Sequence, residues 1–277
     1  PAPEPAPSAS VTKQVSSSTP TTPSPLEIVE SILREITGLY VAIEDRFTAR
    51  VIAKLVKDHN EIPSSGSPSN LIDEAFYALT KALERAAATM DASAFAATAG
   101  GANERISTDI QSALESWLKS WNSGATERRL DSFIAIVNDI ETAARNTVQL
   151  REHATALLGK RMPGCPQMQR IMACLDDFGH TAKFLRTLAS QNIARLSKTV
   201  LANVHSSMES FMVTDYRLTQ AQYEAFDVND PFMHELIGVL EPTLDAFQKV
   251  LNPGNGDLLL EIVAIEVLRQ VEDIVKQ

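Results

Sequence analysis

The fold is decided most plainly by residues 223–251, which begin with the letters YEAFDVNDPF. Asp230 is a good N-cap, because its side-chain oxygen accepts a hydrogen bond from a free N–H of the first helical turn, and Pro231 has no N–H to leave unpaired. Large apolar residues then recur every three or four positions, on one stripe of a helix: Phe232, Leu236, Leu240, Leu244, Phe247 and Leu251. The sequence therefore predicts an amphipathic helix that begins at Pro231 and needs a partner for its stripe.

Two residues inside this helix predict a bend. Pro242 removes the hydrogen bond to the carbonyl of Gly238 and crowds that carbonyl, and Gly238 itself has a low helix propensity. We expect the bent helix to pack against residues 258–274. The residues to which we assign a structural role here are Asp230, Pro231, Gly238 and Pro242.

The rest of the chain has the same helical character. Of its 277 residues 44% are hydrophobic, and the low counts of aromatic residues (6%) and glycine (11) favour helix over sheet. The longest apolar stripe runs through residues 26–55 and predicts a long helix that packs along a neighbour at a shallow angle. Residues 252–256 (NPGNG) predict a strong turn before a final helix. The predicted fold class is all-α, with elongated stacked helical bundles.

Breaks in the helical pattern predict the domain organisation. Residues 1–25 are rich in proline, serine and threonine and predict a disordered linker. Residues 26–158 predict a first helical bundle, residues 159–166 a hinge loop, and residues 167–277 a second bundle that is incomplete at its C-terminus.

The hinge is the densest cluster of helix breakers in the interior of the sequence, with Gly159, Pro163, Gly164 and Pro166. A second interruption is expected at residues 92–101, where an uncharged run of alanine and glycine predicts a frayed, flexible connection.

Charge and cysteine content exclude several classes of partner. The net charge of −10 gives no broad cationic surface, so nucleic acid is an unfavourable partner. The most apolar window, residues 258–268, is interrupted by Glu261 and Glu266 and is far shorter than the roughly 20 apolar residues of a membrane span. Two cysteines, Cys165 and Cys174, are too few for a disulfide framework or a zinc site.

No motif for catalysis or for a cofactor is present in the sequence. The five histidines are scattered over different helical stretches, and Gly238 stands where a helical zinc motif begun by His234 and Glu235 would require a second histidine. The sequence has neither a phosphate-binding Gly-Lys-Ser/Thr loop nor a Gly-x-Ser-x-Gly elbow. We therefore predict no catalytic residue, no metal ligand and no cofactor, and a protein that is not an enzyme.

Four runs of sequence together resemble a known family: residues 35–47 (EITGLYVAIEDRF), 70–79 (NLIDEAFYAL), 229–232 (NDPF) and 263–268 (VAIEVL). They are similar, in order and approximate spacing, to subunit four of the conserved oligomeric Golgi complex, a vesicle-tethering assembly. Residues 92–101 depart from the family pattern, and the chain lacks both the N-terminal coiled-coil region and the C-terminal helical domain of the family.

The resemblance implies a rod of stacked helical bundles without enzymatic activity. Such a subunit acts peripherally on the cytosolic face of Golgi membranes in retrograde intra-Golgi transport, through contacts with other subunits of the tether and with SNARE and Rab proteins. Two other interpretations stay open: a helical scaffold of another tethering or regulatory complex and, more remotely, a helical metal-dependent or lipid enzyme.

Overall fold

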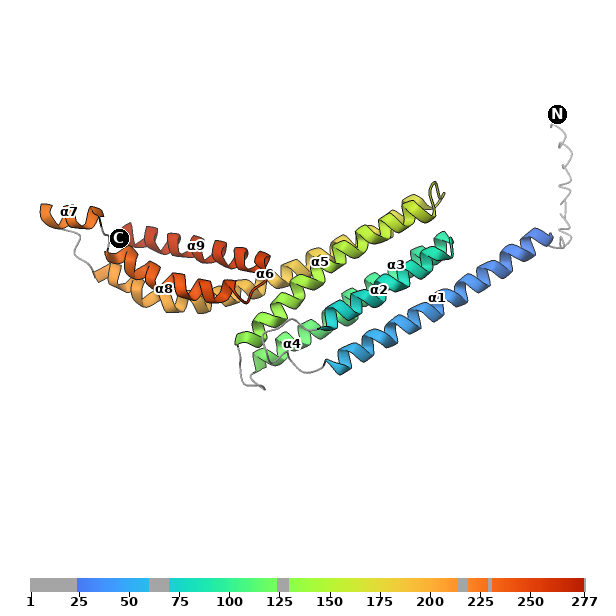
Figure 1. Cartoon of the computed structure of the whole chain (residues 1–277), viewed down its shortest axis with the longest axis horizontal. Helices are drawn as coiled ribbons and strands as arrows, with labels where there is room; N and C mark the ends of the chain where they lie inside the picture. The colour runs from blue at the N-terminus through green and yellow to red at the C-terminus, as the bar shows by residue number, and fades with distance from the viewer. Residues whose placement is uncertain (1–23, 60–69, 124–129, 214–218, 229–230, 277) are drawn as a thin grey trace, which may run out of the picture.

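The computed structural model describes residues 24–59, 70–123, 130–213, 219–228 and 231–276. Within these residues every regular element is helical, which confirms the predicted all-α fold (Figure 1). The elements are α1 (Pro25–Asp58), α2 (Asn70–Ala88), α3 (Ala92–Arg105), the π-helical segment η1 (Ile106–Ile110), α4 (Gln111–Ser123), α5 (Leu130–Arg161), α6 (Met168–Val213), α7 (Gln220–Val228), α8 (Pro231–Gln248) and α9 (Pro253–Val275). The predicted disordered linker lies outside the described residues except for Ser24 and Pro25, which begin α1.

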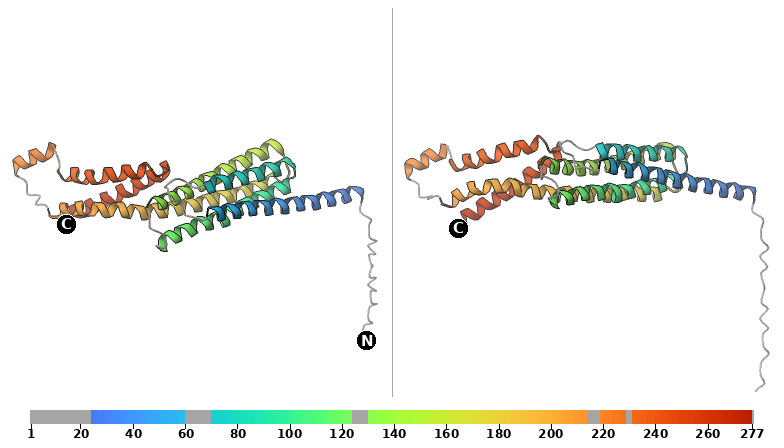
Figure 2. Two further views of the ribbon diagram at one scale, coloured as in Figure 1. Left: turned by 60° about the horizontal axis from the view of Figure 1, so that its bottom comes forward. Right: turned by 90° about the horizontal axis from the view of Figure 1, so that it is seen from below.

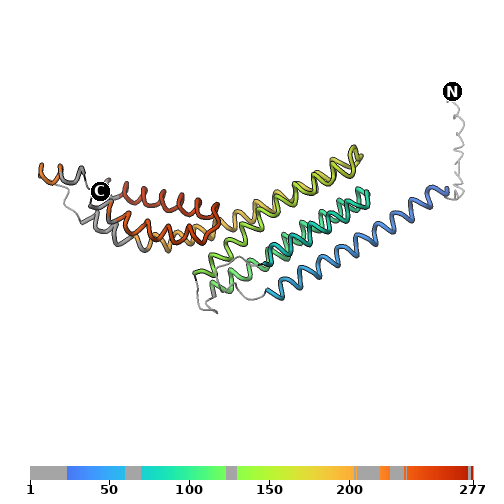
Figure 3. Tube along the Cα trace, in the orientation of Figure 1, coloured from blue at the N-terminus to red at the C-terminus, as the bar shows by residue number. Residues whose placement is uncertain are grey.

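The helices form two groups along the long axis of the molecule, and α6 belongs to both (Figures 1 and 2). Its first part packs against α5 and α3, and its last part packs against α8 and α9. The first group is completed by α1, α2 and α4. The Cα trace in Figure 3 follows α6 without a break from one group into the other.

Helix α6 forms because one apolar stripe continues through its whole length. With 46 residues it is about 70 Å long at 1.5 Å per residue. Large apolar residues at intervals of three or four, or at sums of these, are almost fully buried along it: Ile171, Leu175, Phe178, Leu185, Ile193, Leu196, Val200 and Val204. The helices that pack against this stripe change along α6, while the spacing of its buried apolar residues stays the same.

The first helix begins at a complete capping box. The Ser24 hydroxyl accepts from the Glu27 amide at 3.3 Å, and the Glu27 carboxylate accepts from the Ser24 amide at 2.6 Å. Pro25 follows at the first helical position, where it leaves no N–H unpaired. Helix α1 is then continuous to Asp58 and packs against α2, α3 and η1.

Residues 92–101 correct the sequence prediction, because they form helix α3 and not a flexible connection. The Asp91 side chain caps this helix, because its Oδ1 accepts hydrogen bonds from the amides of Ser93 and Ala94 at 2.8 Å each. Alanine is the best helix former, and Phe95 is fully buried, so packing and capping together offset the low propensity of the two glycines. The helix continues through η1 into α4.

Helix α9 gives a second correction. It begins at Pro253, so residues 253–256 of the predicted turn are its first turn, with the Gly256 amide donating to the Asn252 carbonyl at 2.9 Å. Helix α8 packs chiefly on α6 and to a smaller extent on α9, which is the predicted neighbour.

The cap of α3 generates a prediction. Asp91→Ala should lower the free energy of unfolding by about 1 kcal/mol, because two amides of the first turn lose their acceptor. Asp91→Asn should be nearly neutral, since asparagine also caps helices well. Hydrogen exchange at Ser93 and Ala94 would check the assignment, and equal exchange in the two variants would contradict it.

Candidate functional site

Two acidic residues of α1, Glu44 and Asp45, face the first group of helices. Glu44 is buried, and the Arg85 guanidinium from α2 donates to it twice, through Nε to Oε2 at 3.1 Å and through Nη2 to Oε1. The same guanidinium lies 5.8 Å from the centre of the Phe47 ring, within cation–π range. The Glu44 hydrogen bond is the largest cause that raises the pKa of Arg85. This two-point contact fixes the register of α1 on α2.

A second ion pair fixes α1 on α3. Arg105 at the end of α3 donates through Nη2 to Asp45 at 3.4 Å and through Nη1 to Asp109 at 3.2 Å. Next to it, the Thr48 hydroxyl donates to the Glu44 carbonyl at 2.8 Å. Burial, followed by the charge of Glu44, raises the pKa of the nearby Tyr40. Polar groups therefore hold α1 to its neighbours.

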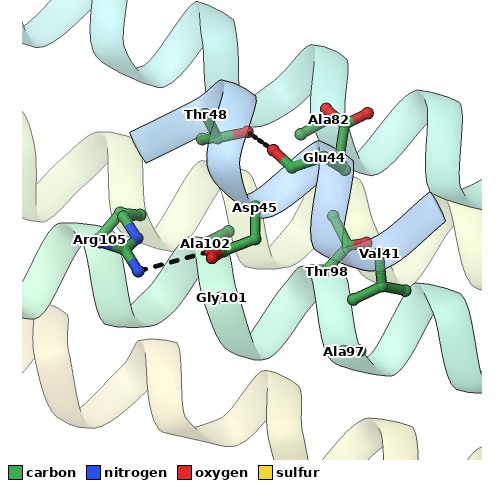
Figure 4. Close-up of a pocket in the computed structure, with 10 residues that line it drawn as sticks. All are labelled: Val41, Glu44, Asp45, Thr48, Ala82, Ala97, Thr98, Gly101, Ala102 and Arg105. Atoms are coloured by element: carbon green, nitrogen blue, oxygen red, sulfur yellow. Dashed lines mark hydrogen bonds and ion pairs between the residues drawn. The ribbon is translucent and has the colours of Figure 1, made fainter. Parts of the chain in front are cut away.

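Between α1, α2 and α3 lies a cavity of about 20 Å³ (Figure 4). Small residues make room for it: Ala82, Ala97, Thr98, Gly101 and Ala102. A cavity of this size holds about one water molecule, whereas ligand pockets measure several hundred cubic ångströms. The close-up shows Asp45 and Arg105 reaching toward each other beside it. The arrangement is suited to structural packing and too small for a cofactor.

Helix α1 turns its predicted apolar stripe away from the bundle. Ile36, Ile43 and Phe47 are 56%, 68% and 55% exposed, although the period of the stripe predicted packing along a neighbour. In the described structure the neighbours of α1 contact mainly its other side, through polar Thr37, Glu44 and Asp45 and buried Ile52, although Tyr40 and Leu55 of the stripe also pack against the core. The apolar stripe is therefore a surface feature of this chain.

The predicted hinge lies at the connection between α5 and α6. Gly159 is in the last turn of α5, and Pro163, Gly164 and Pro166 are in the exposed turn that follows. Gly164 has a φ of +70°, in the left-handed region that favours glycine. The amide of Cys165 donates to the Met162 carbonyl at 3.3 Å, which closes the turn. Because α6 continues into the second group, the role of this turn as a hinge between bundles stays a prediction.

The structural residues predicted for α8 lie in the other group. Asp230 is outside the described residues, whereas Pro231 is the first residue of α8 as predicted. Pro242 is exposed within α8, which continues to Gln248, and Gly238 has open space where a Cβ would be. The structure does not bring these residues together with the α5–α6 turn, and the predicted bend stays a prediction.

An asparagine network that sequence reasoning missed joins α5 to the turn between α8 and α9. Buried Asn138 donates through Nδ2 to the Val250 carbonyl at 2.8 Å and accepts through Oδ1 from the Asn252 amide at 2.8 Å. Asn255, also buried, donates to the same Oδ1 at 3.2 Å. The sequence contained a signal of this network, because polar Asn138 lies within a largely apolar run, residues 133–140, all of which are buried. This network ties the second group to the first.

The residues that the structure describes contain no group of three or more histidine, cysteine, aspartate or glutamate side chains placed to hold a metal ion. Among the helices of this part of the chain, none combines the length and the apolar character that crossing a bilayer requires.

Comparison with known proteins shows the family of this sequence. The sequence model of the family described as "Conserved oligomeric Golgi complex subunit 4, C-terminal" matches residues 133–277. The chain belongs to this family. The match to the subunit 4 family starts in α5 and runs through α9, so it includes the asparagine network and both sides of the predicted hinge.

Curated relatives extend the similarity to α1–α4. Proteins named "Conserved oligomeric Golgi complex subunit 4" are 22% identical in Arabidopsis thaliana, over 88% of this chain and 34% of the relative, and 20% identical in Caenorhabditis elegans, over 87% and 33%. The Homo sapiens protein of that name is 20% identical over 88% of this chain and 36% of its own length. The chain thus spans about a third of these relatives, and no solved structure matches it.

The ion pair of α1 generates a prediction. Arg85→Ala leaves the buried Glu44 carboxylate without its two donors, so we expect the free energy of unfolding to fall by about 1–3 kcal/mol. Lys81→Ala is a matched control on the same helix, because it removes only a solvent-exposed pair with Glu84. Thermal unfolding should show a clear loss for the first variant alone, and equal losses would contradict the assigned role of Glu44.

The asparagine network generates a further prediction about stability. Asn138→Ala removes an acceptor and a donor from the buried junction and should cost about 1–3 kcal/mol, since the Val250 carbonyl and Asn252 amide lose their partner. Hydrogen exchange at Asn252 should accelerate. Asn146→Ala, two turns further along α5, is the control and should leave that amide protected. Unchanged protection in Asn138→Ala would show that other contacts hold the junction.

Proposed function

We propose that this chain is a non-enzymatic part of a Golgi vesicle-tethering subunit, which scaffolds retrograde intra-Golgi transport through contacts with other subunits of the complex and with SNARE and Rab proteins. The observation that carries the proposal is the family match over residues 133–277. We place the protein peripherally on the cytosolic face of Golgi membranes, held there through its complex.

The architecture supports a mechanical role. A helix about 70 Å long, shared by two helical groups, makes a rod that holds points on its surface at fixed separations. Partners attached to such a rod meet at a raised effective concentration, which promotes their association without any chemical step. Membrane capture by a tether needs reach and defined spacing of this kind.

The polar clusters of the described residues fit this role better than catalysis. Glu44 with Arg85 and Asn138 with Asn252 each join one helix to another, and each group is occupied by its structural partner. These contacts stiffen the rod. A helical scaffold of another tethering or regulatory complex would share these features, and the family match favours the Golgi complex over it.

Affinity isolation of the full-length protein tests the proposal. We expect the wild-type protein to recover the other subunits of the Golgi complex. Leu185→Asp, which places a charge at a fully buried position of α6, should lose them by disrupting the rod, whereas Arg186→Asp on the exposed neighbour should retain them. Recovery of none of these subunits by the wild-type protein would contradict the proposal.

A further inference from the structure

Helix α1 has two faces of opposite character. Its polar side is joined to the bundle by Glu44, Asp45 and Thr37, as described above. The other side exposes nine large apolar side chains: Leu26, Ile28, Val29, Ile32, Leu33, Ile36, Leu39, Ile43 and Phe47. Monomeric soluble proteins rarely expose so large a contiguous apolar patch, so this face is expected to have a partner.

The apolar face is one continuous seam. At 100° per residue, all of these side chains except Ile28 fall within an arc of about 140°. Leu26, Val29, Leu33, Ile36, Tyr40, Ile43 and Phe47 alternate steps of three and four, the repeat by which helices pack along each other. The occupant is therefore a helix that runs nearly parallel or antiparallel to α1.

Charge along α1 changes sign near its middle. Exposed Glu27, Glu30 and Glu35 make the first half acidic, with Arg34 as the one base there. In the second half, exposed Arg46, Arg50, Lys54 and Lys57 outnumber exposed Asp45 and Asp58, so the exposed charge there is net positive. Asp45 is paired with Arg105 of the same chain, and Glu44 is buried. A membrane-binding face would instead carry a basic rim along its whole length. An antiparallel helix with the same gradient complements α1 in both halves.

We propose that this face is an interface between two copies of this chain, with their α1 helices antiparallel about a two-fold axis near Tyr40. Leu33 of one copy then lies opposite Phe47 of the other, and Ile36 opposite Ile43. Glu35 and Arg46 lie on the same flank of the seam, because eleven residues return a helix to within about 20°. The two-fold axis therefore brings Glu35 against Arg46 of the other copy, twice.

The shape of the molecule accommodates this arrangement. The beginning of α1 extends past the ends of α2 and α3, while its later part borders α2 (Figures 1 and 2). An open groove of about 560 Å³ runs between α1 and α2 there, lined by Phe47, Val51, Leu55 and Tyr77. Antiparallel pairing seats the projecting half of one α1 beside the groove of the other. The charged residues that line this groove are Glu74, Lys81 and Arg85, so its net positive charge then meets the acidic half of the second copy.

Charge reversal tests the proposal through sedimentation equilibrium of this chain at low salt. We expect the wild-type chain to form dimers. Glu35→Arg or Arg46→Glu should each raise the dissociation constant about tenfold, because each creates two like-charge contacts. In the double variant the dissociation constant should return to within about threefold of the wild-type value. Ile36→Asp should leave monomers. Its position is exposed, so the helix content by circular dichroism should not change.

Arg34→Glu is the matched control, since this exposed charge lies about 80° beyond the opposite edge of the apolar arc, farther from the seam than Glu35 or Arg46, and should not alter the dissociation constant. A wild-type chain that stays monomeric at all concentrations would overturn the proposal, as would dimers that survive Ile36→Asp. Single-charge variants that the double variant does not rescue would exclude the antiparallel arrangement. These measurements use the purified chain alone, so their outcome is independent of the proposed tethering function.

Discussion

Helix α6 is the constraint on which the remaining structure depends. One uninterrupted run of residues, 168–213, buries its apolar stripe first against α5 and α3 and then against α8 and α9. Because one continuous helix belongs to both, the two groups lie end to end and the molecule is elongated (Figure 1). The rod is therefore a property of a single helix more than of any contact between two separate units.

Buried polar contacts then set how the other helices sit on this axis. The hydrophobic effect is non-directional and leaves helices free to slide, whereas a bidentate Arg85–Glu44 pair or an amide shared by Asn138, Asn252 and Asn255 is satisfied in one register only. The first contact joins α1 to the next helix, α2, and the second joins α5 to the turn before α9 and to the first turn of α9. They give the rod a fixed shape, which is what a scaffold requires, and α1 is held by its polar side so that its apolar side stays outward.

Periodicity predicted the helices well and their termini less well. The stripe in residues 231–251 and the long stripe in residues 26–55 both became helices, and the family resemblance, carried in part by the runs NDPF and VAIEVL, was confirmed by the family match over residues 133–277. Residues 92–101 were wrongly predicted as flexible, because glycine propensity was weighed without the Asp91 cap and the burial of Phe95. Polar Asn138 within the run of residues 133–140 indicated a buried polar contact, but its partner could not be predicted, since that partner lies in a turn more than a hundred residues away in sequence.

The sequence by itself determined the fold class, the helical character of nearly every segment and the membership of a family, because these depend on local period, composition and runs of residues. Only the tertiary structure decided which face of each helix is buried. The stripe of α1 has the period of a buried seam, yet most of its large side chains are exposed, because Glu44, Asp45 and buried Ile52 hold the other side of the helix on the bundle. Periodicity alone does not say toward which neighbour a stripe points. Likewise, the glycine and proline residues of 159–166 predicted an interruption of the helical pattern. The continuity of α6 beyond them depends on α3, α5, α8 and α9, which pack on it only in the folded chain.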